Sequence, residues 1–229
     1  MATPKNVELN KVFEAAEFDI LTGVLKPRER LIETDCMLHY QTNRNTIRKV
    51  FKDLELKKLV KHYPNRGVMV AELSEKEIAD IVSTRVRLES WAADMVVKNS
   101  SSKALNRIRQ HHSEFVNFIQ KKNFRGTLIS NIQFHQTIFQ LCGNDVLSEI
   151  IDQLRTRSHL LRHYIWRQPR RLEKSIEEHE DLIKAIENGD AERLRQINER
   201  HITAGVKNYI EDIKSLKPEI KPKERSLVK

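Results

Sequence analysis

Glycine and proline are scarce in this chain, with only 6 of each among its 229 residues. Both residues interrupt helices, whereas the abundant Leu, Ile, Lys and Glu favour or tolerate them. Because so few interruptions leave long stretches that can form helices, the composition predicts a mainly α-helical protein. The apolar residues, 39% of the chain, suffice for the core of one large domain or two small ones.

The first third of the chain reads as short helices followed by one small hairpin. Apolar residues recur at helical spacing, and Asn43 is a plausible N-cap. Two short apolar runs flank a Pro-Asn-Arg-Gly turn, which favours a pair of strands. The expected elements are a helix that ends near Gly23, helices over 33–39 and 44–57, and strands over 59–63 and 68–71.

Beyond Ser74 the pattern is helical throughout. The sequence Ser74-Glu75-Lys76-Glu77 resembles a capping box at the start of a long helix. Six successive helices with short connections favour an antiparallel bundle. The expected helices cover 75–97, 103–121, 124–142, 145–166, 171–188 and 190–213. The predicted fold is therefore a domain over 7–73, a helical domain over 74–213 and a basic, solvated tail over 214–229.

Charge and composition exclude several classes of protein. The formal net charge is +9, which favours nucleic acid or an anionic ligand as a partner. No apolar run approaches the roughly 18 residues that span a membrane, and the first ten residues lack a signal-peptide core. Two cysteines, Cys36 and Cys142, cannot form a disulfide framework. We therefore expect a cytoplasmic protein with reduced thiols and no membrane partner.

Basic residues are concentrated between Arg44 and Arg66, where eight Lys or Arg face only two acidic residues. Arg44 and Arg48 are one helical turn apart, and arginine can hold guanine with two hydrogen bonds. Small polar side chains at the start of this helix favour contacts with DNA phosphates, and Lys52 further along the helix is expected to make such a contact too. A solvated helix face is the alternative, but the order of two helices, a turn, a basic helix and a basic hairpin favours DNA binding.

Four motifs follow one another in the first 73 residues. They are Ile20-x-x-Gly-Val-Leu-x-Pro-x-Glu-Arg-Leu-Ile-Glu, Asn43-Arg-Asn-Thr-Ile-Arg, Leu54-Glu-x-x-x-Leu-Val and Pro64-Asn-Arg-Gly-Val-x-Val. Together they resemble the winged helix-turn-helix of the GntR family of bacterial regulators. The chain departs from the family at Thr34, where Arg is usual, and at Gln41, where Gly is usual. The resemblance implies DNA contacts by Asn43, Arg44, Asn45, Thr46, Arg48, Arg66 and Gly67.

Three histidines lie at core positions of apolar helical stripes. His135, His179 and His201 each alternate with Leu, Ile or Phe at helical spacing, on three different predicted helices. One such residue is usually a core histidine with ordinary polar partners. Three of them, if they converge, suit Zn²⁺, Ni²⁺ or a similar ion, with the amide of Asn131 one turn before His135. Periodicity alone does not show that the helices meet.

Residues 74–213 also carry family motifs. Arg85-x-x-Leu-Glu, Phe134-His135, Cys142-Gly-Asn and Glu178-His179 resemble the FCD ligand-binding domain of the FadR subfamily of GntR regulators. The resemblance implies that an acidic residue and three histidines hold a divalent metal, zinc or nickel, inside the bundle. His135, His179 and His201 match the histidines, and the acidic position holds Asn131.

The chemistry of this site suggests how an effector would bind. A neutral amide in place of a carboxylate leaves more of the metal's charge uncompensated, so an anionic effector is expected to complete the coordination. Arg85 and Arg155 are candidate partners of its carboxylate, because guanidinium binds carboxylate bidentately. A structural ion pair is the alternative role for Arg85.

These features predict a homodimeric transcription regulator, more often a repressor than an activator in such families. Its winged helices would bind a pseudo-palindromic double-stranded DNA operator, and its bundle would bind a small carboxylate together with a divalent metal. A metal sensor is one alternative. A three-histidine metalloenzyme is another, although no carboxylate is clearly paired with the site as a general base.

Overall fold

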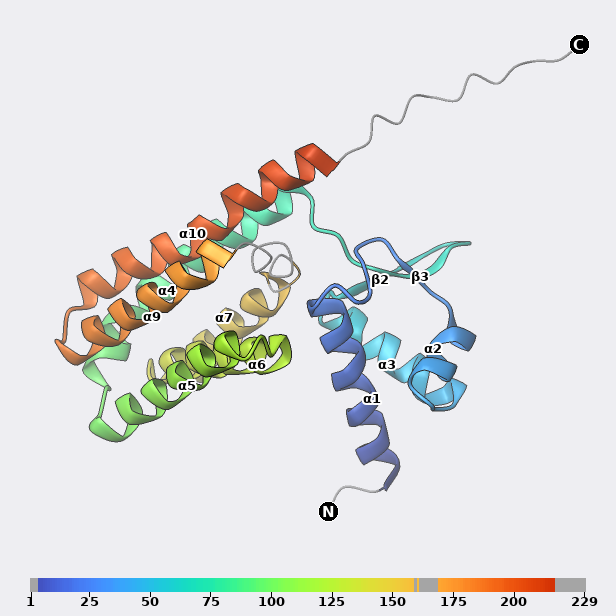
Figure 1. Ribbon diagram of the computed structural model, residues 1–229, viewed down its shortest axis with the longest axis horizontal. Coiled ribbons are helices and arrows are strands. Elements are labelled where there is room, and N and C mark those ends of the chain that lie inside the picture. The colour runs from blue at the N-terminus through green and yellow to red at the C-terminus, as the bar shows by residue number, and fades with distance from the viewer. Residues whose placement is uncertain (1–3, 159, 161–168, 217–229) are drawn as a thin grey trace, which may run out of the picture.

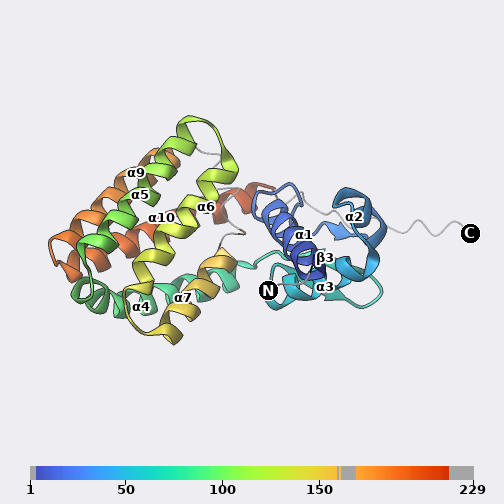
Figure 2. The ribbon, with the colours of Figure 1, turned by 90° about the horizontal axis from the view of Figure 1, so that it is seen from below.

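The protein consists of a small winged-helix part and a larger helical bundle that lie side by side (Figure 1). The computed structural model describes residues 4–158, 160 and 169–216. The view from below shows α1 between the rest of the winged-helix part and the bundle (Figure 2). The fold class predicted from the sequence, mainly α with a winged helix-turn-helix before a helical bundle, is confirmed.

Three helices and a three-stranded sheet make up the winged-helix part. The inward face of α3 supplies fully buried side chains, among them Ile47, Val50 and Leu54, against which α1 and α2 pack. This face repeats every three to four residues, which is why the segment forms an amphipathic helix. The helices are α1 (Pro4–Leu21), α2 (Glu33–His39) and α3 (Arg44–Leu56), and the strands are β1 (Arg30–Leu31), β2 (Val60–Tyr63) and β3 (Gly67–Val70).

The sheet is antiparallel, with β3 in the middle and β1 and β2 at its edges. The β2–β3 hairpin was predicted, and its register pairs Val60 with Val70 and Tyr63 with Gly67. The prediction of only two strands was wrong, because Arg30 of β1 pairs with Met69. The sheet therefore ties the turn that follows α1 to the wing.

Six helices form the rest of the described chain. The first, α4, begins with the predicted capping box: the Ser74 side chain accepts a hydrogen bond from the Glu77 backbone, and Glu77 accepts one from Ser74. Neighbouring helices pack in antiparallel pairs, most extensively α5 with α6 and α4 with α10. The helices are α4 (Glu75–Lys98), α5 (Ser102–Gln120), α6 (Phe124–Gln140), α7 (Asp145–Ser158), α9 (Pro169–Glu187) and α10 (Ala191–Leu216).

The six predicted bundle helices are confirmed, with ends that differ by a few residues from the expected ones. The predicted helix over 145–166 is described as far as Ser158, and most of its remainder lies outside the described residues. Most of the predicted tail, from 217 onward, also lies outside them. Both cysteines are buried free thiols, as expected. Within the described ranges, no helix combines the length and the apolar character that crossing a bilayer requires.

Candidate DNA interface and metal centre

The start of α3 is capped in the way the sequence predicts. The Asn43 side-chain oxygen accepts a hydrogen bond from the Thr46 backbone nitrogen at 3.0 Å, which satisfies one of the free N–H groups at the helix start. Asn45 is exposed beside this cap, and Thr46 is half-buried. The amide oxygen of Asn43 thus fixes the start of the helix, and its backbone carbonyl accepts the first helical hydrogen bond, from the Ile47 nitrogen at 3.1 Å.

Arg44 and Arg48 lie on the same exposed face of α3, with 55% and 62% of their side chains accessible. Both contact the carboxylate of Glu33 at the start of α2. Arg48 Nε donates to Glu33 Oε1 at 2.8 Å, and Arg44 Nε is 3.4 Å from Glu33 Oε2. The predicted recognition arginines are therefore held together by one carboxylate that the sequence analysis did not single out.

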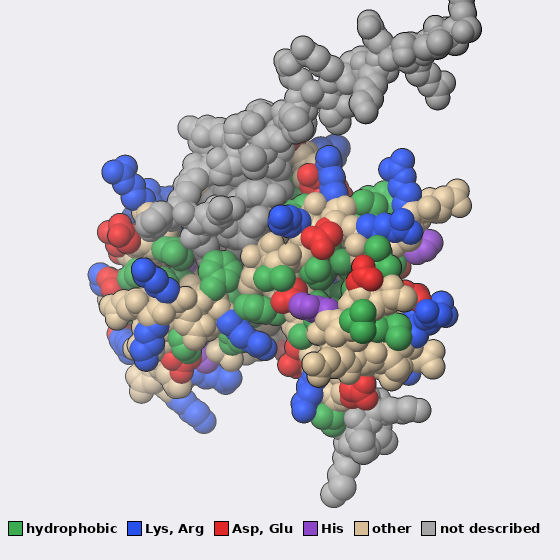
Figure 3. Space-filling view, turned by 45° about the vertical axis from the view of Figure 1, so that its right-hand side comes forward, with side chains coloured by type: hydrophobic (Ala, Val, Ile, Leu, Met, Phe, Trp, Pro, Cys, Tyr) green, Lys and Arg blue, Asp and Glu red, His purple; other side chains and the backbone are tan. Residues whose placement is uncertain are grey.

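The other predicted DNA contacts are also at the surface. Lys52 is exposed on α3, and Arg66 is exposed at the tip of the β2–β3 hairpin. Gly67 has a φ of +76°, a conformation that side chains disfavour, so glycine suits this position of the turn. On the face drawn in Figure 3, Lys and Arg side chains are interspersed with acidic and apolar ones, so the net charge is spread rather than gathered there.

The three predicted metal-binding histidines converge inside the bundle. Their ring centroids are 5.0 to 5.2 Å apart in every pairing, and one ring nitrogen from each lies within 4.8 Å of the others. His135 and His179 are fully buried, and His201 is 11% exposed in its side chain. Asn131 is also buried, one turn before His135 on α6. Three buried imidazoles form a donor set that fits a divalent ion such as zinc or nickel.

Glu178 fixes the orientation of His201. Its Oε2 accepts hydrogen bonds from His201 Nδ1 at 2.7 Å and from Arg171 Nη1 at 2.9 Å. The proton on Nδ1 leaves Nε2 of His201 as the atom able to bind a cation. Burial lowers the pKa of His201 to about 4, so the ring is neutral at pH 7. Burial alone raises the pKa of the Glu178 carboxyl, but the hydrogen bond from His201 and the charge of Arg171 lower it to about 2.

A second buried cluster joins α4, α7 and α10. The Glu89 carboxylate is fully buried and contacts Arg85 Nε at 2.8 Å and Arg155 Nη1 at 3.1 Å. Asn198 donates to the same carboxylate at 3.0 Å. Two guanidinium groups against one carboxylate leave this cluster with a net charge of +1. Arg85, also 3.3 Å from the Ser158 hydroxyl, has the structural ion pair that was its alternative role.

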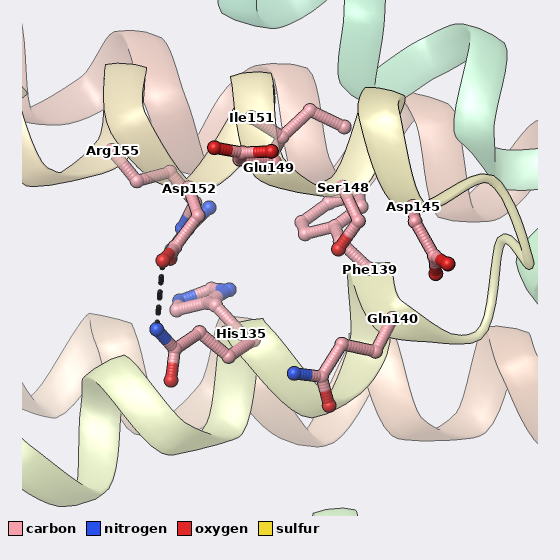
Figure 4. Close-up of a pocket in the computed structure, with 10 residues that line it drawn as sticks. His135, Phe139, Gln140, Asp145, Ser148, Glu149, Ile151, Asp152 and Arg155 are labelled. Atoms are coloured by element: carbon pink, nitrogen blue, oxygen red, sulfur yellow. Dashed lines mark hydrogen bonds between the residues drawn. The ribbon is translucent and has the colours of Figure 1, made fainter.

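A cavity of about 250 Å³ opens between α6 and α7 (Figure 4). His135 and Arg155 both line it, so one histidine of the three-histidine cluster and one arginine of the positive cluster face the same space. Arg85 is not among its lining residues. Gln136 donates to Asp152 across the cavity at 2.8 Å. The lining residues are His135, Gln136, Phe139, Gln140, Asp145, Ser148, Glu149, Ile151, Asp152 and Arg155.

Besides Glu33, sequence reasoning missed three contributors to the sites inside the bundle. Glu178 entered only as part of a motif, and Glu89 only as the last residue of Arg85-x-x-Leu-Glu. His112 belongs to none of the predicted sites, yet its ring lies 5.8 Å from that of His179. An acidic residue at a core position of an amphipathic helix was the available signal for both glutamates, because a buried carboxylate requires charged or hydrogen-bonding partners.

The chain matches a known domain family and curated relatives along most of its length. Residues 80–204 match the FCD domain. An uncharacterised HTH-type transcriptional regulator of Bacillus subtilis, YdhC, is 23% identical over 196 residues, which cover 85% of this chain and 86% of that protein. The gluconate operon transcriptional repressor of B. subtilis is 23% identical over 202 residues, which cover 85% and 81%.

Solved structures show the same arrangement. Escherichia coli McbR/YncC has a TM-score of 0.78 at 20% identity, with 93% of this chain and all of that chain covered. A putative GntR transcriptional regulator from Rhodococcus has a TM-score of 0.75 at 20% identity, with coverages of 89% and 97%. A structure titled as the metal-free FCD domain of TM0439 has a TM-score of 0.52 at 19% identity, with coverages of 63% and 99%.

The FCD match spans more than half of the chain, and the matched relatives are transcriptional regulators rather than enzymes. The chain therefore belongs to the FCD-domain family and is a transcriptional regulator of the GntR type.

Proposed function

We propose that this regulator represses transcription from a pseudo-palindromic operator and that a small organic acid, bound with a divalent metal in the bundle, controls its affinity for DNA. The convergence of His135, His179 and His201 carries the metal part of the proposal. We further propose that the DNA-binding domain spans 7–73, the effector domain 74–213 and a basic tail 214–229. The regulator would act in the cytoplasm.

Imidazole nitrogens of His135, His179 and His201, with the amide of Asn131, would hold the metal. When bound, it would supply a Lewis-acid attachment point for an anionic group. Arg155 adds a guanidinium to the same cavity, and we propose it as the second contact of the effector carboxylate. Arg85 would act mainly through Glu89, whose carboxylate it shares with Arg155.

The cavity also bears on which acids fit. Asp145, Glu149 and Asp152 line it, so a second carboxylate on the ligand would meet negative charge, whereas hydroxyl groups would find acceptors. We therefore propose a hydroxylated monocarboxylic acid rather than a dicarboxylic acid. The name of the B. subtilis gluconate operon repressor, a relative at 23% identity, is consistent with that class.

A homodimer is the proposed assembly. α4 packs against α7, and each of these helices exposes large apolar side chains: Trp91 is 59% exposed on α4, and Val146 is 68% exposed on α7. Burial of such side chains against a second copy would remove apolar surface from water. Two winged-helix parts would then meet two half-sites of one operator.

Metal and effector binding are tested together on the purified full chain. Elemental analysis should find one divalent metal per chain in the wild type and little in His179→Ala, while circular dichroism shows that the variant is folded. In thermal-shift measurements, gluconate should raise the melting temperature of the wild type, and succinate should leave it unchanged. Full metal content in His179→Ala contradicts the metal site. Operator binding that responds to metal but to no acid favours a metal sensor instead.

DNA binding is tested with an operator selected by the wild-type protein from random duplexes. Arg48→Ala should lower operator affinity by a factor that corresponds to roughly 1–3 kcal/mol and relax the preference at one base position. Lys52→Ala, a phosphate contact, should weaken binding to all duplexes alike and reduce the salt dependence. Equal losses on operator and random DNA for Arg48→Ala contradict its role in base recognition.

A further inference from the structure

The structure places one carboxylate between the two arginines proposed to read DNA. Glu33 belongs to α2, and Arg44 and Arg48 belong to α3, eleven or more residues further along the chain. Glu33 Oε1 accepts a hydrogen bond from Arg48 Nε at 2.8 Å, and Glu33 Oε2 is 3.4 Å from Arg44 Nε. Each of the two carboxylate oxygens thus faces a different arginine.

We propose that Glu33 is a positioning residue that sets the DNA specificity of this regulator by holding Arg44 and Arg48 in one arrangement. This inference rests on the proposed contacts of both arginines with DNA. It adds a residue that itself need not touch a base.

The atoms used in these contacts leave the arginines competent for recognition. The hydrogen bond to Glu33 engages Nε of Arg48, so its two terminal amino groups remain to donate to guanine O6 and N7. Both side chains are more than half exposed, so DNA can approach them. Guanidinium groups with restricted rotamers lose less conformational entropy when they bind a base edge.

The same carboxylate opposes binding to random DNA. On a duplex without the right bases, the arginines gain most by turning to phosphate, which supplies nearly all the affinity for non-specific DNA. When the two arginine side chains move to phosphate, the Glu33 carboxylate is left without its partners and close to the negatively charged DNA backbone. The hydrogen bond from Arg48, together with the charges of both arginines, lowers the pKa of the Glu33 carboxyl, so the group is ionised at neutral pH. Non-specific binding is therefore penalised more than operator binding.

Asp35 provides a matched control on the same helix. Its Oδ1 accepts a hydrogen bond from the Thr34 hydroxyl at 3.2 Å, and within the described part of the chain it forms no ion pair with an arginine. Glu33→Gln and Asp35→Asn each remove one negative charge near the DNA-binding face, so general electrostatics change alike. Only Glu33→Gln weakens the hold on the two arginines.

The experiment measures the affinity of each full-length variant for the selected operator and for a scrambled duplex, over a range of salt concentrations. Glu33→Gln should strengthen scrambled-duplex binding and lower the ratio of operator to scrambled affinity about three- to tenfold relative to Asp35→Asn. Its salt dependence on scrambled DNA should be steeper, because more arginine–phosphate contacts form. An unchanged ratio, or one equal to that of Asp35→Asn, overturns the proposal.

Glu33→Asp separates position from charge. It keeps the negative charge but withdraws the carboxylate by one methylene, so its affinity ratio should fall between those of the wild type and Glu33→Gln. A ratio equal to that of the wild type overturns a positioning role. If the wild type selects no operator, the proposed function itself has failed, and if Arg48→Ala leaves the affinity ratio intact, the proposed base contact of Arg48 has failed. Both outcomes differ from an unchanged ratio in Glu33→Gln alone.

Discussion

Gln41 occupies a turn in a backbone conformation that suits glycine. Its φ is +50°, in the left-handed region that glycine adopts without strain, and it lies between α2 and α3. A left-handed conformation costs a residue with a side chain roughly 1–2 kcal/mol. The chain therefore carries local strain next to its recognition helix.

Gln41→Gly should raise the free energy of unfolding by about 0.5–1 kcal/mol, since relief of the strain exceeds the extra freedom that glycine gives the unfolded chain. Urea titration followed by circular dichroism measures the change. Gln41→Ala is the control, because alanine keeps the strain, and its stability should match that of the wild type. Equal stabilisation by both substitutions would contradict this explanation.

Asn131 sets the charge of the proposed metal site, because its side chain is a neutral amide. An Asp at this position would add a negative charge beside the cation. Asn131→Asp should therefore raise the metal affinity and reduce the further gain that an organic acid provides. Competition with a chelating dye, with and without gluconate, measures both effects. An unchanged affinity for the acid in Asn131→Asp argues against charge compensation by the effector.

At the scale of elements, the Glu89 cluster connects three helices of the bundle. Removing one member of a buried ion pair leaves the other charges uncompensated, which costs about 3–5 kcal/mol. Glu89→Gln should therefore lower the free energy of unfolding by about that amount at pH 7. Glu187→Gln is the control, because its ion pair with Arg109 is at the surface and should contribute less than about 1 kcal/mol.

The same cluster makes a prediction about pH. Burial raises the pKa of the Glu89 carboxyl, but the charges of Arg85 and Arg155 outweigh burial, so the pKa in the folded state is lowered. A lowered pKa stabilises the fold above the unfolded-state pKa of about 4.3, and this stability is lost as the pH falls through the folded-state pKa. The stability difference between the wild type and Glu89→Gln should shrink as the pH falls below about 4, as urea titrations at pH 7 and pH 3.5 would show.

Helices and their ends were predictable because their signals are local. The residues that form the apolar stripe of α3 lie close together in the sequence, and so do the residues of the capping box at Ser74. The strand β1 was not predictable, because two residues show no period and its partner, Met69, is far along the chain. Helical periodicity likewise placed His135, His179 and His201 on inward faces without showing that those faces meet. Their convergence needs the packing of α6, α9 and α10, which only the resemblance supplied.

At the scale of the whole molecule, the apolar core does not stop at the boundary between the two parts. One cluster of buried side chains runs from Leu54 of α3 to Phe115 of α5 and Leu128 of α6. The Phe115 ring lies 4.9 Å from that of His179, so the three-histidine cluster contacts the same apolar cluster. On the surface, the Arg125 guanidinium of α6 lies 4.9 Å from the Phe18 ring of α1.

Arg125→Ala should reduce the change in operator affinity caused by Zn²⁺, because it removes a contact between the two parts. Metal affinity should stay within about twofold of that of the wild type, since Arg125 lies near the start of α6 and His135 lies near its end. Lys57→Ala is the control, because the Lys57 ammonium lies over Phe13 entirely within the winged-helix part. A full response to Zn²⁺ in Arg125→Ala would exclude this contact from the coupling.

The short connection between the wing and α4 has a mechanical consequence. Only four residues separate the end of β3 at Val70 from the start of α4 at Glu75. A movement of the N-terminal end of α4 would therefore move the wing with it. Glu89 lies fourteen residues into α4, which is about 21 Å along a helix that rises about 1.5 Å per residue. A tilt of about 10° around Glu89 would therefore displace the base of the wing by about 4 Å. A displacement of that size would separate a wing side chain from a DNA phosphate that it contacts, because a hydrogen bond spans only about 3 Å.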